Sequence, residues 1–162
     1  MSKTIEIRPA TASDLALVFA FVKELAAFEH LEHEVEANEA LLGKALFGEH
    51  PRVFADIAEY EGQPAGFILW FYTFSSFVGR HGIWIEDIYV REAYRKKGLG
   101  AAMLHNIARR CVEEKLGRLE WSVLDWNENA IRFYESTGAR LMRDWRICRL
   151  VGPALHEFAR AS

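Results

Sequence analysis

Two strand-like runs separated by a short turn sequence place an antiparallel pair of strands at the centre of this chain. The runs cover residues 52–60 and 65–74, and the turn between them contains Gly62 and Pro64. Glycine and proline between two such runs are typical of a β-hairpin. A third run, residues 82–90, follows and is rich in Ile, Trp, Tyr and Val, which favour strands. The middle of the fold is therefore predicted to be antiparallel.

Helices and further strands surround this centre. Strands are predicted over residues 4–8, 119–124 and 141–150, and helices over residues 15–26, 37–47, 99–112 and 127–137. The order is strand, helix, helix, three strands, helix, strand, helix, strand, which predicts an α/β fold with a mixed sheet and crossover connections in its later part. No repeat or linker divides the chain, so residues 1–162 are expected to form a single domain.

Composition restricts the function. A net charge of −3 argues against a general nucleic-acid or membrane binder, which would carry a basic excess. Cys111 and Cys148 provide neither a disulfide framework nor a CxxC metal pair, and Cys111 is predicted to lie in the core. The N-terminus has no apolar signal segment, and no run reaches transmembrane length, so a cytoplasmic location is expected.

A basic, glycine-containing stretch precedes the third predicted helix. Arg95, Lys96 and Lys97 come directly before Gly98, and Gly100 follows one residue later. Glycine allows a ligand to approach the backbone, and a helix N-terminus attracts anions, so phosphate or pyrophosphate is the natural ligand. The same letters also fit a tight turn with solvated lysines, and the local sequence leaves both readings open.

Two known phosphate loops can be compared with this stretch. The GxxxxGK[ST] pattern of a P-loop is absent. A dinucleotide fingerprint would need glycine or alanine where Met103 stands, and about seven residues separate Val90 from Gly98. Glu120 lies about where a ribose-binding acid would stand, so a nucleotide-dependent oxidoreductase is disfavoured but stays a rival.

Three blocks in one order resemble a known family. Residues 95–100, RKKGLG, resemble the R/Q-x-x-G-x-G/A loop of the GNAT acetyltransferases, and IEDIYV at residues 85–90 precedes it as in that family. Residues 126–139, WNENAIRFYESTGA, are similar to its W-N-x-x-A-x-x-F-Y-x-x-x-G-A segment. Residues 7–11, 23–26, 28–29 and 48–51 resemble the diamine (spermidine/spermine) N-acetyltransferase branch, which includes thialysine acetyltransferases.

The resemblance implies a GNAT-like fold: a twisted, mostly antiparallel sheet whose middle strands splay apart and are flanked by helices. It implies acetyl-CoA as co-substrate, no metal, and a homodimer. The pyrophosphate would lie on the backbone of residues 96–101, and the acetyl-pantetheine arm along residues 88–90. The implied cofactor-binding residues are Ile88, Tyr89, Val90, Arg95, Lys96, Lys97, Gly98, Leu99, Gly100, Ala101, Asn127, Glu128, Asn129 and Ala130.

Acetyl transfer to an amine needs a neutral nitrogen, although a lysine-type amine has a pKa of ~10.4. The resemblance makes Glu86 the catalytic proton acceptor, directly or through a water. Asp87 should point to the opposite face of a regular strand, unless a bulge intervenes. Tyr134 would be the general acid that protonates the leaving thiolate. The alternatives are that both acids are solvated or salt-bridged and that Phe133-Tyr134 only packs its helix.

The predicted acceptor is a small cationic amine. Residues 29–39 contain five glutamates and no lysine or arginine, a pattern that also suits a solvated loop and helix start. The family match implies the substrate-binding residues Phe28, Glu29, Glu86, Asp87, Glu120, Trp121 and Ser122. Residues 76–78 are Ser-Phe-Val where the polyamine enzymes carry Asp-Pro-Trp, so a diamine, ornithine, lysine or thialysine is supported at least as well as a polyamine.

Two further alternatives remain. A non-catalytic acyl-CoA-binding or partner-binding domain could keep the same scaffold, although the presence of Tyr134 and Glu86 argues against it. His30 and His33 are spaced at i, i+3, but a metal site needs further ligands, and no metal is expected.

Overall fold

The structure, a computed structural model, describes residues 4–160 of this 162-residue chain. Its contacts gather in two compact units, Met1–Ser122 and Val123–Ser162, and each is described by itself. The expected single domain over residues 1–162 stays a prediction.

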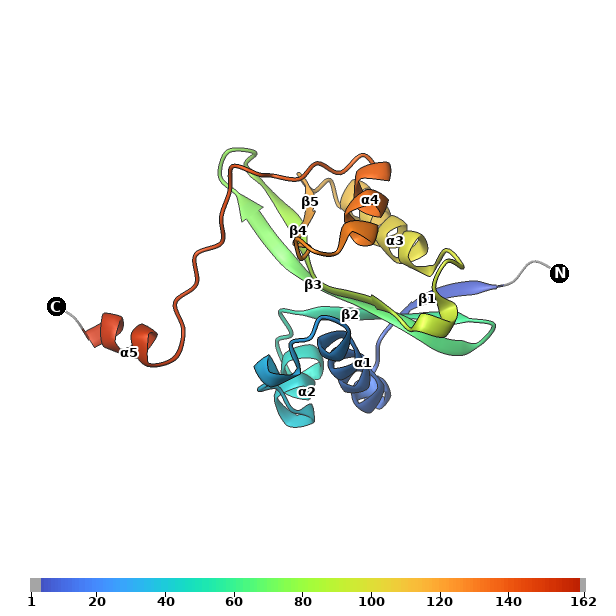
Figure 1. Cartoon of the computed structure of the whole chain (residues 1–162), viewed down its shortest axis with the longest axis horizontal. Helices are drawn as coiled ribbons and strands as arrows, with labels where there is room; N and C mark the ends of the chain where they lie inside the picture. The colour runs from blue at the N-terminus through green and yellow to red at the C-terminus, as the bar shows by residue number, and fades with distance from the viewer. Residues whose placement is uncertain (1–3, 161–162) are drawn as a thin grey trace. The chain divides into compact units, whose positions relative to one another are not determined.

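The first unit is built on a five-stranded sheet whose strands stand in sequence order (Figure 1). The strands are β1 (Ile5–Pro9), β2 (Phe54–Tyr60), β3 (Gln63–Ser75), β4 (Arg80–Val90) and β5 (Leu119–Trp121). β1 to β4 pair antiparallel, and β5 pairs parallel with β4. The predicted mixed α/β class with an antiparallel centre is confirmed.

The turn between β2 and β3 is two residues long, not the four that the sequence suggested. Glu61 has a φ of 52° and Gly62 a φ of 76°, while Tyr60 pairs with Gln63. Positive φ at both positions is what a two-residue hairpin turn requires, because its twist then matches that of the strands. β3 therefore begins at Gln63 and includes Pro64.

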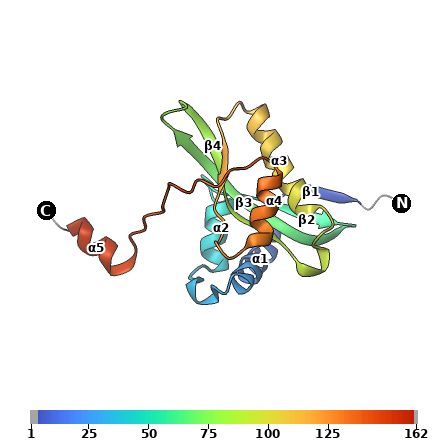
Figure 2. The same cartoon turned by 45° about the horizontal axis from the view of Figure 1, so that its top comes forward.

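Helices cover both faces of the sheet (Figures 1 and 2). α1 (Leu15–Phe28) and α2 (Glu39–Phe47) pack on one face. There the Phe21 ring stacks on Phe67 of β3 with centroids 5.3 Å apart. The buried cluster on this face comprises Val18, Phe21, Leu46, Ala55, Ile57, Phe67 and Leu69.

α3 (Leu99–Glu113) lies on the opposite face of the sheet. It buries Met103 and Ile107 completely, and Cys111 is buried as predicted. Arg110 of α3 stacks over Trp70 of β3, with its guanidinium carbon 5.0 Å from the ring centroid. Three short 3-10 turns complete this unit: Ala12–Asp14, Glu32–Glu34 and Glu92–Tyr94.

Asp14 anchors the start of α1 to the sheet. Its carboxylate accepts hydrogen bonds from the Thr11 backbone N–H at 2.8 Å and from both terminal nitrogens of Arg8 at 2.8 and 3.0 Å. Arg8 also donates from Nε to Glu59 of β2 at 2.8 Å. The entry to α1 is thus fixed to β1 and β2 by one charged network.

The second unit contains α4 (Glu128–Ser136) and α5 (Gly152–Arg160), and it corrects one expectation. Residues 141–150 form no strand, and Trp145 and Ile147 are 76% and 73% exposed. A strand exists only when a neighbouring strand supplies hydrogen bonds, and the apolar pattern of a segment cannot specify that neighbour. α5 was not predicted.

No helix within residues 4–160 is both long and apolar enough to span a membrane.

Candidate functional site

β4 contains a bulge at the site that the sequence singled out. Trp70 pairs with Ile85 and Leu69 with Asp87, so Glu86 is an extra residue in β4. β5 pairs with β4 only through three residues, of which Ile85 is the last. Within the described chain, no strand pairs with residues 86–90 on that side. The backbone groups on that side of this stretch could therefore accept a strand-like ligand.

The bulge changes which face each acid occupies. In a regular strand Ile85 and Asp87 would share a face. Here Ile85 lies opposite Trp70, on the α3 face, whereas Asp87 lies opposite Leu69, a member of the cluster under α1 and α2. An extra residue in one strand reverses the alternation beyond it. Asp87 therefore faces the end of α1.

Three carboxylates occupy this region. Burial raises the pKa of Asp87 to about 7, and the charges of Glu86 and Glu29 add to the effect. Burial also raises the pKa of Glu29, which directly follows α1. Glu86 is exposed, and its carboxylate accepts a hydrogen bond from the Trp84 indole N–H at 3.0 Å. The structure thus brings Glu29 close to the adjacent residues Glu86 and Asp87, which lie far from it in the sequence.

Arg95 joins this region to the glycine turn. Its Nε donates to the Val90 carbonyl at 3.0 Å, and its guanidinium lies 4.5 Å from the centre of the Phe28 ring and 5.9 Å from that of Tyr89. Tyr89 in turn contacts Phe21 of the core. The cation therefore links the end of β4 to the last residue of α1.

The glycine turn opens α3 directly. Gly98 has a φ of 92° and Lys96 a φ of 60°, and α3 begins at Leu99. A side chain at Gly98 would meet only Ile5 at 3.6 Å, so glycine is needed there for its backbone conformation. The first backbone N–H groups of a helix lack intrahelical partners and carry the positive end of its dipole. Together with Lys96 and Lys97 they suit an anion.

The predicted residues of β5 lie beside β4. Glu120 pairs in register with Trp84, and Trp121 pairs with Ile85. Glu120 also forms an ion pair with Nε of Arg118 at 2.7 Å. Ser122 directly follows β5.

The predicted residues of the second unit lie at the start of α4 and along it. Asn127 Oδ1 accepts the Ala130 N–H at 3.2 Å and so caps α4. Glu128 and Asn129 both contact Arg132, at 3.3 and 2.6 Å. Tyr134 lies on the same helix, with its ring 5.5 Å from that of Phe133. That these residues meet the site on β4 stays a prediction.

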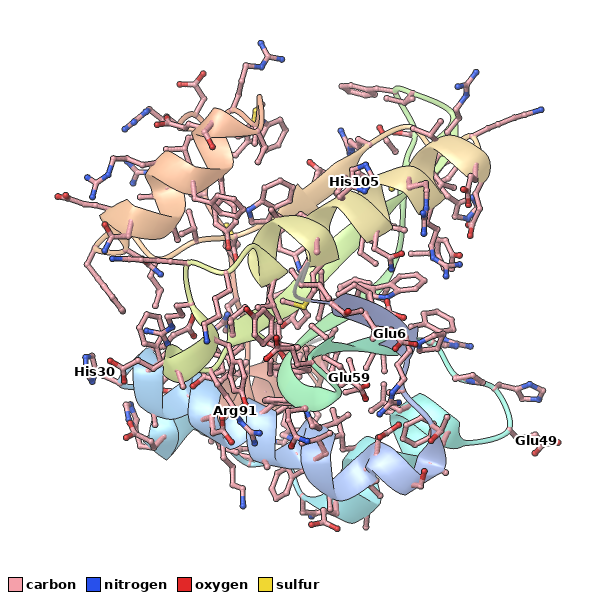
Figure 3. The ribbon with its side chains drawn as sticks, turned by 90° about the vertical axis from the view of Figure 1, so that its right-hand side faces the viewer. Glu6, His30, Glu49, Glu59, Arg91 and His105 are labelled. Carbon is pink, nitrogen blue, oxygen red and sulfur yellow. The ribbon has the colours of Figure 1, made fainter. Side chains whose placement is uncertain are left out.

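Sequence reasoning missed two residues that hold the site in place. Arg91 binds the Glu24 carboxylate through Nε and a terminal nitrogen at 3.0 and 2.8 Å, and it donates to the Pro64 carbonyl at 3.1 Å (Figure 3). It thereby ties α1 to the end of β4. Trp84 holds Glu86 as described above. The Arg91 contact joins residues 67 positions apart, and the Trp84 contact involves the extra residue of the bulge, which the sequence does not reveal.

The histidines do not gather into a metal site. His33 contacts Glu34 at 3.5 Å, and both side chains are exposed. Across residues 4–160 no group of three or more His, Cys, Asp or Glu side chains could hold a metal ion. The expectation that no metal takes part stays a prediction.

Solved structures share the fold of this chain. An integron cassette protein from V. cholerae superposes with a TM-score of 0.80 at 26% identity, covering 99% of this chain and 100% of that chain. A possible acetyltransferase from Clostridium difficile 630 superposes with a TM-score of 0.73 at 25% identity, covering 90% and 95%. The fold is that of an acetyltransferase.

Residues 19–139 match the acetyltransferase (GNAT) family, and the chain belongs to this family. L-ornithine N5-acetyltransferase NATA1 from Arabidopsis thaliana is 34% identical over 92% of this chain and 85% of the relative. Thialysine N-epsilon-acetyltransferase from Caenorhabditis elegans is 32% identical over 97% and 98%. Spermidine/spermine N(1)-acetyltransferase-like protein 1 from Homo sapiens is 32% identical over 83% of this chain and 20% of its own length. The resemblance to the diamine and thialysine branch is confirmed, and the chain is an N-acetyltransferase enzyme.

Proposed function

We propose that this enzyme transfers the acetyl group of acetyl-CoA directly to the primary amine of a small cationic substrate. The observation that carries the proposal is the edge of β4 left unpaired beyond Ile85, which leads into the glycine turn at the start of α3. A strand edge followed by a helix N-terminus suits a ligand that has an amide-containing arm and a pyrophosphate.

The donor site uses mainly backbone groups. Residues 88–90 would hydrogen-bond the pantetheine arm, and the N–H groups of residues 96–101 would bind the pyrophosphate, with the three preceding cations adding attraction. Residues 127–130 would bind the other side of the donor. When bound, acetyl-CoA supplies an activated thioester carbonyl. The open space at Gly98 fits this use, because an added side chain would meet only Ile5 there.

The acceptor site is acidic. Glu29, Glu86 and Asp87 face one region of the first unit, and Glu120 lies on the neighbouring strand. Such a site attracts an ammonium group and disfavours an anionic acceptor. The relatives that act on ornithine and thialysine support a diamine, ornithine, lysine or thialysine as the acceptor.

The chain must manage two protons. The ammonium must lose one before its nitrogen can attack, and the carboxylates at the bulge provide acceptors, with Glu86 as the residue that the family resemblance favours. The sulfur must gain one as it leaves, and we assign that role to the phenol of Tyr134, whose usual pKa of ~10 is near that of a thiol at ~8.5.

An assay of thiol release tests the proposal. The purified protein is incubated with acetyl-CoA and a panel of putrescine, spermidine, ornithine, lysine and thialysine, and free thiol is measured. Saturable release with at least one amine, accompanied by an acetylated product in mass spectrometry, is expected. Thermal stabilisation by CoA without acetylation of any amine would instead favour a non-catalytic acyl-CoA-binding domain.

By the same family resemblance we propose a homodimer in the cytoplasm. Light scattering coupled to gel filtration tests the assembly, since a homodimer has twice the 18.6 kDa mass of the chain.

A further inference from the structure

We propose that Asp87, rather than Glu86, takes the proton from the substrate ammonium. The inference rests on the proposed function and names the proton acceptor within that same site. The two acids are adjacent in the sequence, and the structure gives them different surroundings.

The bulge gives Asp87 its position. Because Glu86 is the extra residue, Asp87 pairs with Leu69 and turns toward the face covered by α1. It is partly buried there, within the electrostatic reach of Glu29 at the end of α1. The next residue on this face is Tyr89, whose ring packs against the core. Asp87 thus lies between the acidic end of α1 and the unpaired edge of β4.

Glu86 has different surroundings. Its side chain is exposed, and the Trp84 indole donates to Oε2 at 3.0 Å. As the extra residue of the bulge, Glu86 has no pairing partner in β3. From this exposed position Glu86 can attract an ammonium, whereas Asp87 is partly buried and lies within the electrostatic reach of Glu29.

The two charges that act on Asp87 both favour proton uptake. Burial is the largest cause of its raised pKa, followed by the negative charges of Glu86 on β4 and Glu29 beyond α1. Arg95, a cation of the same region, lies on the Phe28 ring and donates from Nε to the Val90 carbonyl. With a pKa of about 7, Asp87 is about half ionised at neutral pH.

The raised pKa of Asp87 lowers the cost of the proton transfer. Transfer from an ammonium of pKa ~10.4 to a carboxylate with a pKa of about 7 is unfavourable by about three powers of ten. A bound ammonium lowers the pKa of Asp87 in the complex and adds to this cost.

The proton count closes. The Asp87 carboxylate accepts one proton from R–NH3+, and the nitrogen lone pair then forms a bond to the thioester carbon while the bond from carbon to sulfur breaks. The new nitrogen–carbon adduct loses a second proton, and the departing sulfur gains one. Asp87 returns its proton to solvent. The products are an N-substituted acetamide, a thiol and one proton.

The test compares two matched variants, Asp87→Asn and Glu86→Gln, in the full chain. Values of kcat and kcat/KM are measured with ornithine and thialysine from pH 5.5 to 9.5, and CoA affinity is measured by calorimetry. A general base contributes about 10²–10⁴-fold. Asp87→Asn is expected to lower kcat/KM at pH 7 by at least 100-fold, and Glu86→Gln by less than tenfold. Both variants should bind CoA within threefold of the wild type.

The pH profile separates a base from a structural role. The wild type should show an inflection near pH 7, and Glu86→Gln should keep it. In Asp87→Asn that inflection should vanish, and the rate should rise about tenfold for each pH unit, because it follows the small fraction of neutral amine. Asp87→Glu should recover part of kcat and restore an inflection.

Three outcomes overturn the inference. The reverse order, with Glu86→Gln the more damaging variant and the inflection lost there, assigns the proton to Glu86. An Asp87→Asn variant with wild-type kcat and an unchanged profile removes Asp87 from proton transfer while leaving the proposed function intact. A wild-type protein that acetylates neither amine, nor any other in the panel, refutes the proposed function and this inference together.

Discussion

Replacing Asp14 by alanine should measure how strongly the start of α1 is tied to the sheet. The Asp14 side chain is only 11% exposed, and its two oxygens accept two hydrogen bonds from Arg8 and two from Thr11, all between 2.8 and 3.0 Å. Arg8 is 32% exposed and keeps Glu59 as a second partner, so its charge is not left unpaired by the change.

The loss of stability can be worked out from the hydrogen bonds that the substitution removes. Hydrogen bonds to charged groups contribute about 1.5–3 kcal/mol, and loss of a capping acceptor costs about 1 kcal/mol. Because Arg8 is partly solvated and remains paired, we expect a total loss of about 2.5–4 kcal/mol in the free energy of unfolding. For a chain of this size that corresponds to a fall of roughly 5–16 °C in Tm.

The pH dependence has a definite sign. Hydrogen bonds from Arg8 hold the pKa of Asp14 well below its usual range, and those from Thr11 act in the same direction. A carboxylate with a lowered pKa contributes stability above its unfolded pKa of ~3.9 and loses that contribution as the pH falls below it. The difference in free energy of unfolding between wild type and variant should therefore be constant from pH 5 to 8 and become smaller below about pH 4.

Urea unfolding followed by circular dichroism at several pH values checks this reasoning. Glu113→Ala is the matched control. Glu113 forms an ion pair with Arg109 at 3.7 Å, and the side chains of Arg109 and Glu113 are 61% and 67% exposed. Loss of this surface pair should lower the free energy of unfolding by less than about 0.5 kcal/mol. If Asp14→Ala lowers the free energy of unfolding no more than this control does, the network does not anchor α1. The same conclusion follows if the difference between wild type and Asp14→Ala grows in acid.

Two further predictions concern the reaction and the strand that serves it. Tyr134→Phe should bind CoA normally but lose at least ~100-fold in kcat, in the range of general acid catalysis; unchanged turnover at saturating amine would remove Tyr134 from the mechanism. Gly66→Ala should cost about 1–3 kcal/mol of stability and weaken CoA binding, because its Cβ would lie 2.4 Å from the Tyr89 carbonyl oxygen and force β3 away from β4. Calorimetry and urea unfolding that both match the wild type would show that β4 tolerates the shift.

Much of the first unit could be predicted because its signals are local. The hairpin between β2 and β3 follows from the residues around Gly62, and α3 follows from the apolar spacing of Met103, Ile107 and Cys111 after Gly98. These patterns depend on the preferences of neighbouring residues. They need no knowledge of the rest of the chain.

The bulge in β4 could not be predicted, so the face of the sheet on which Asp87 lies could not be predicted either. Residues 85–90 read as a regular strand, and the extra residue is visible only in the register against β3. The same limit explains the segment 141–150, whose apolar residues favour a strand although none forms. Pairing is a property of two segments, and one sequence pattern describes only one of them.

The short pairing of β5 has a consequence for handling the protein without its ligand. Residues 86–90 present backbone groups along one side that no described strand of the same chain completes. Such an edge can template pairing with a foreign chain. The solubility of the protein should therefore depend on whether a ligand covers this edge. A CoA-type molecule bound there would protect a concentrated sample from self-association. A sample that has been thoroughly dialysed should be the most prone to precipitate.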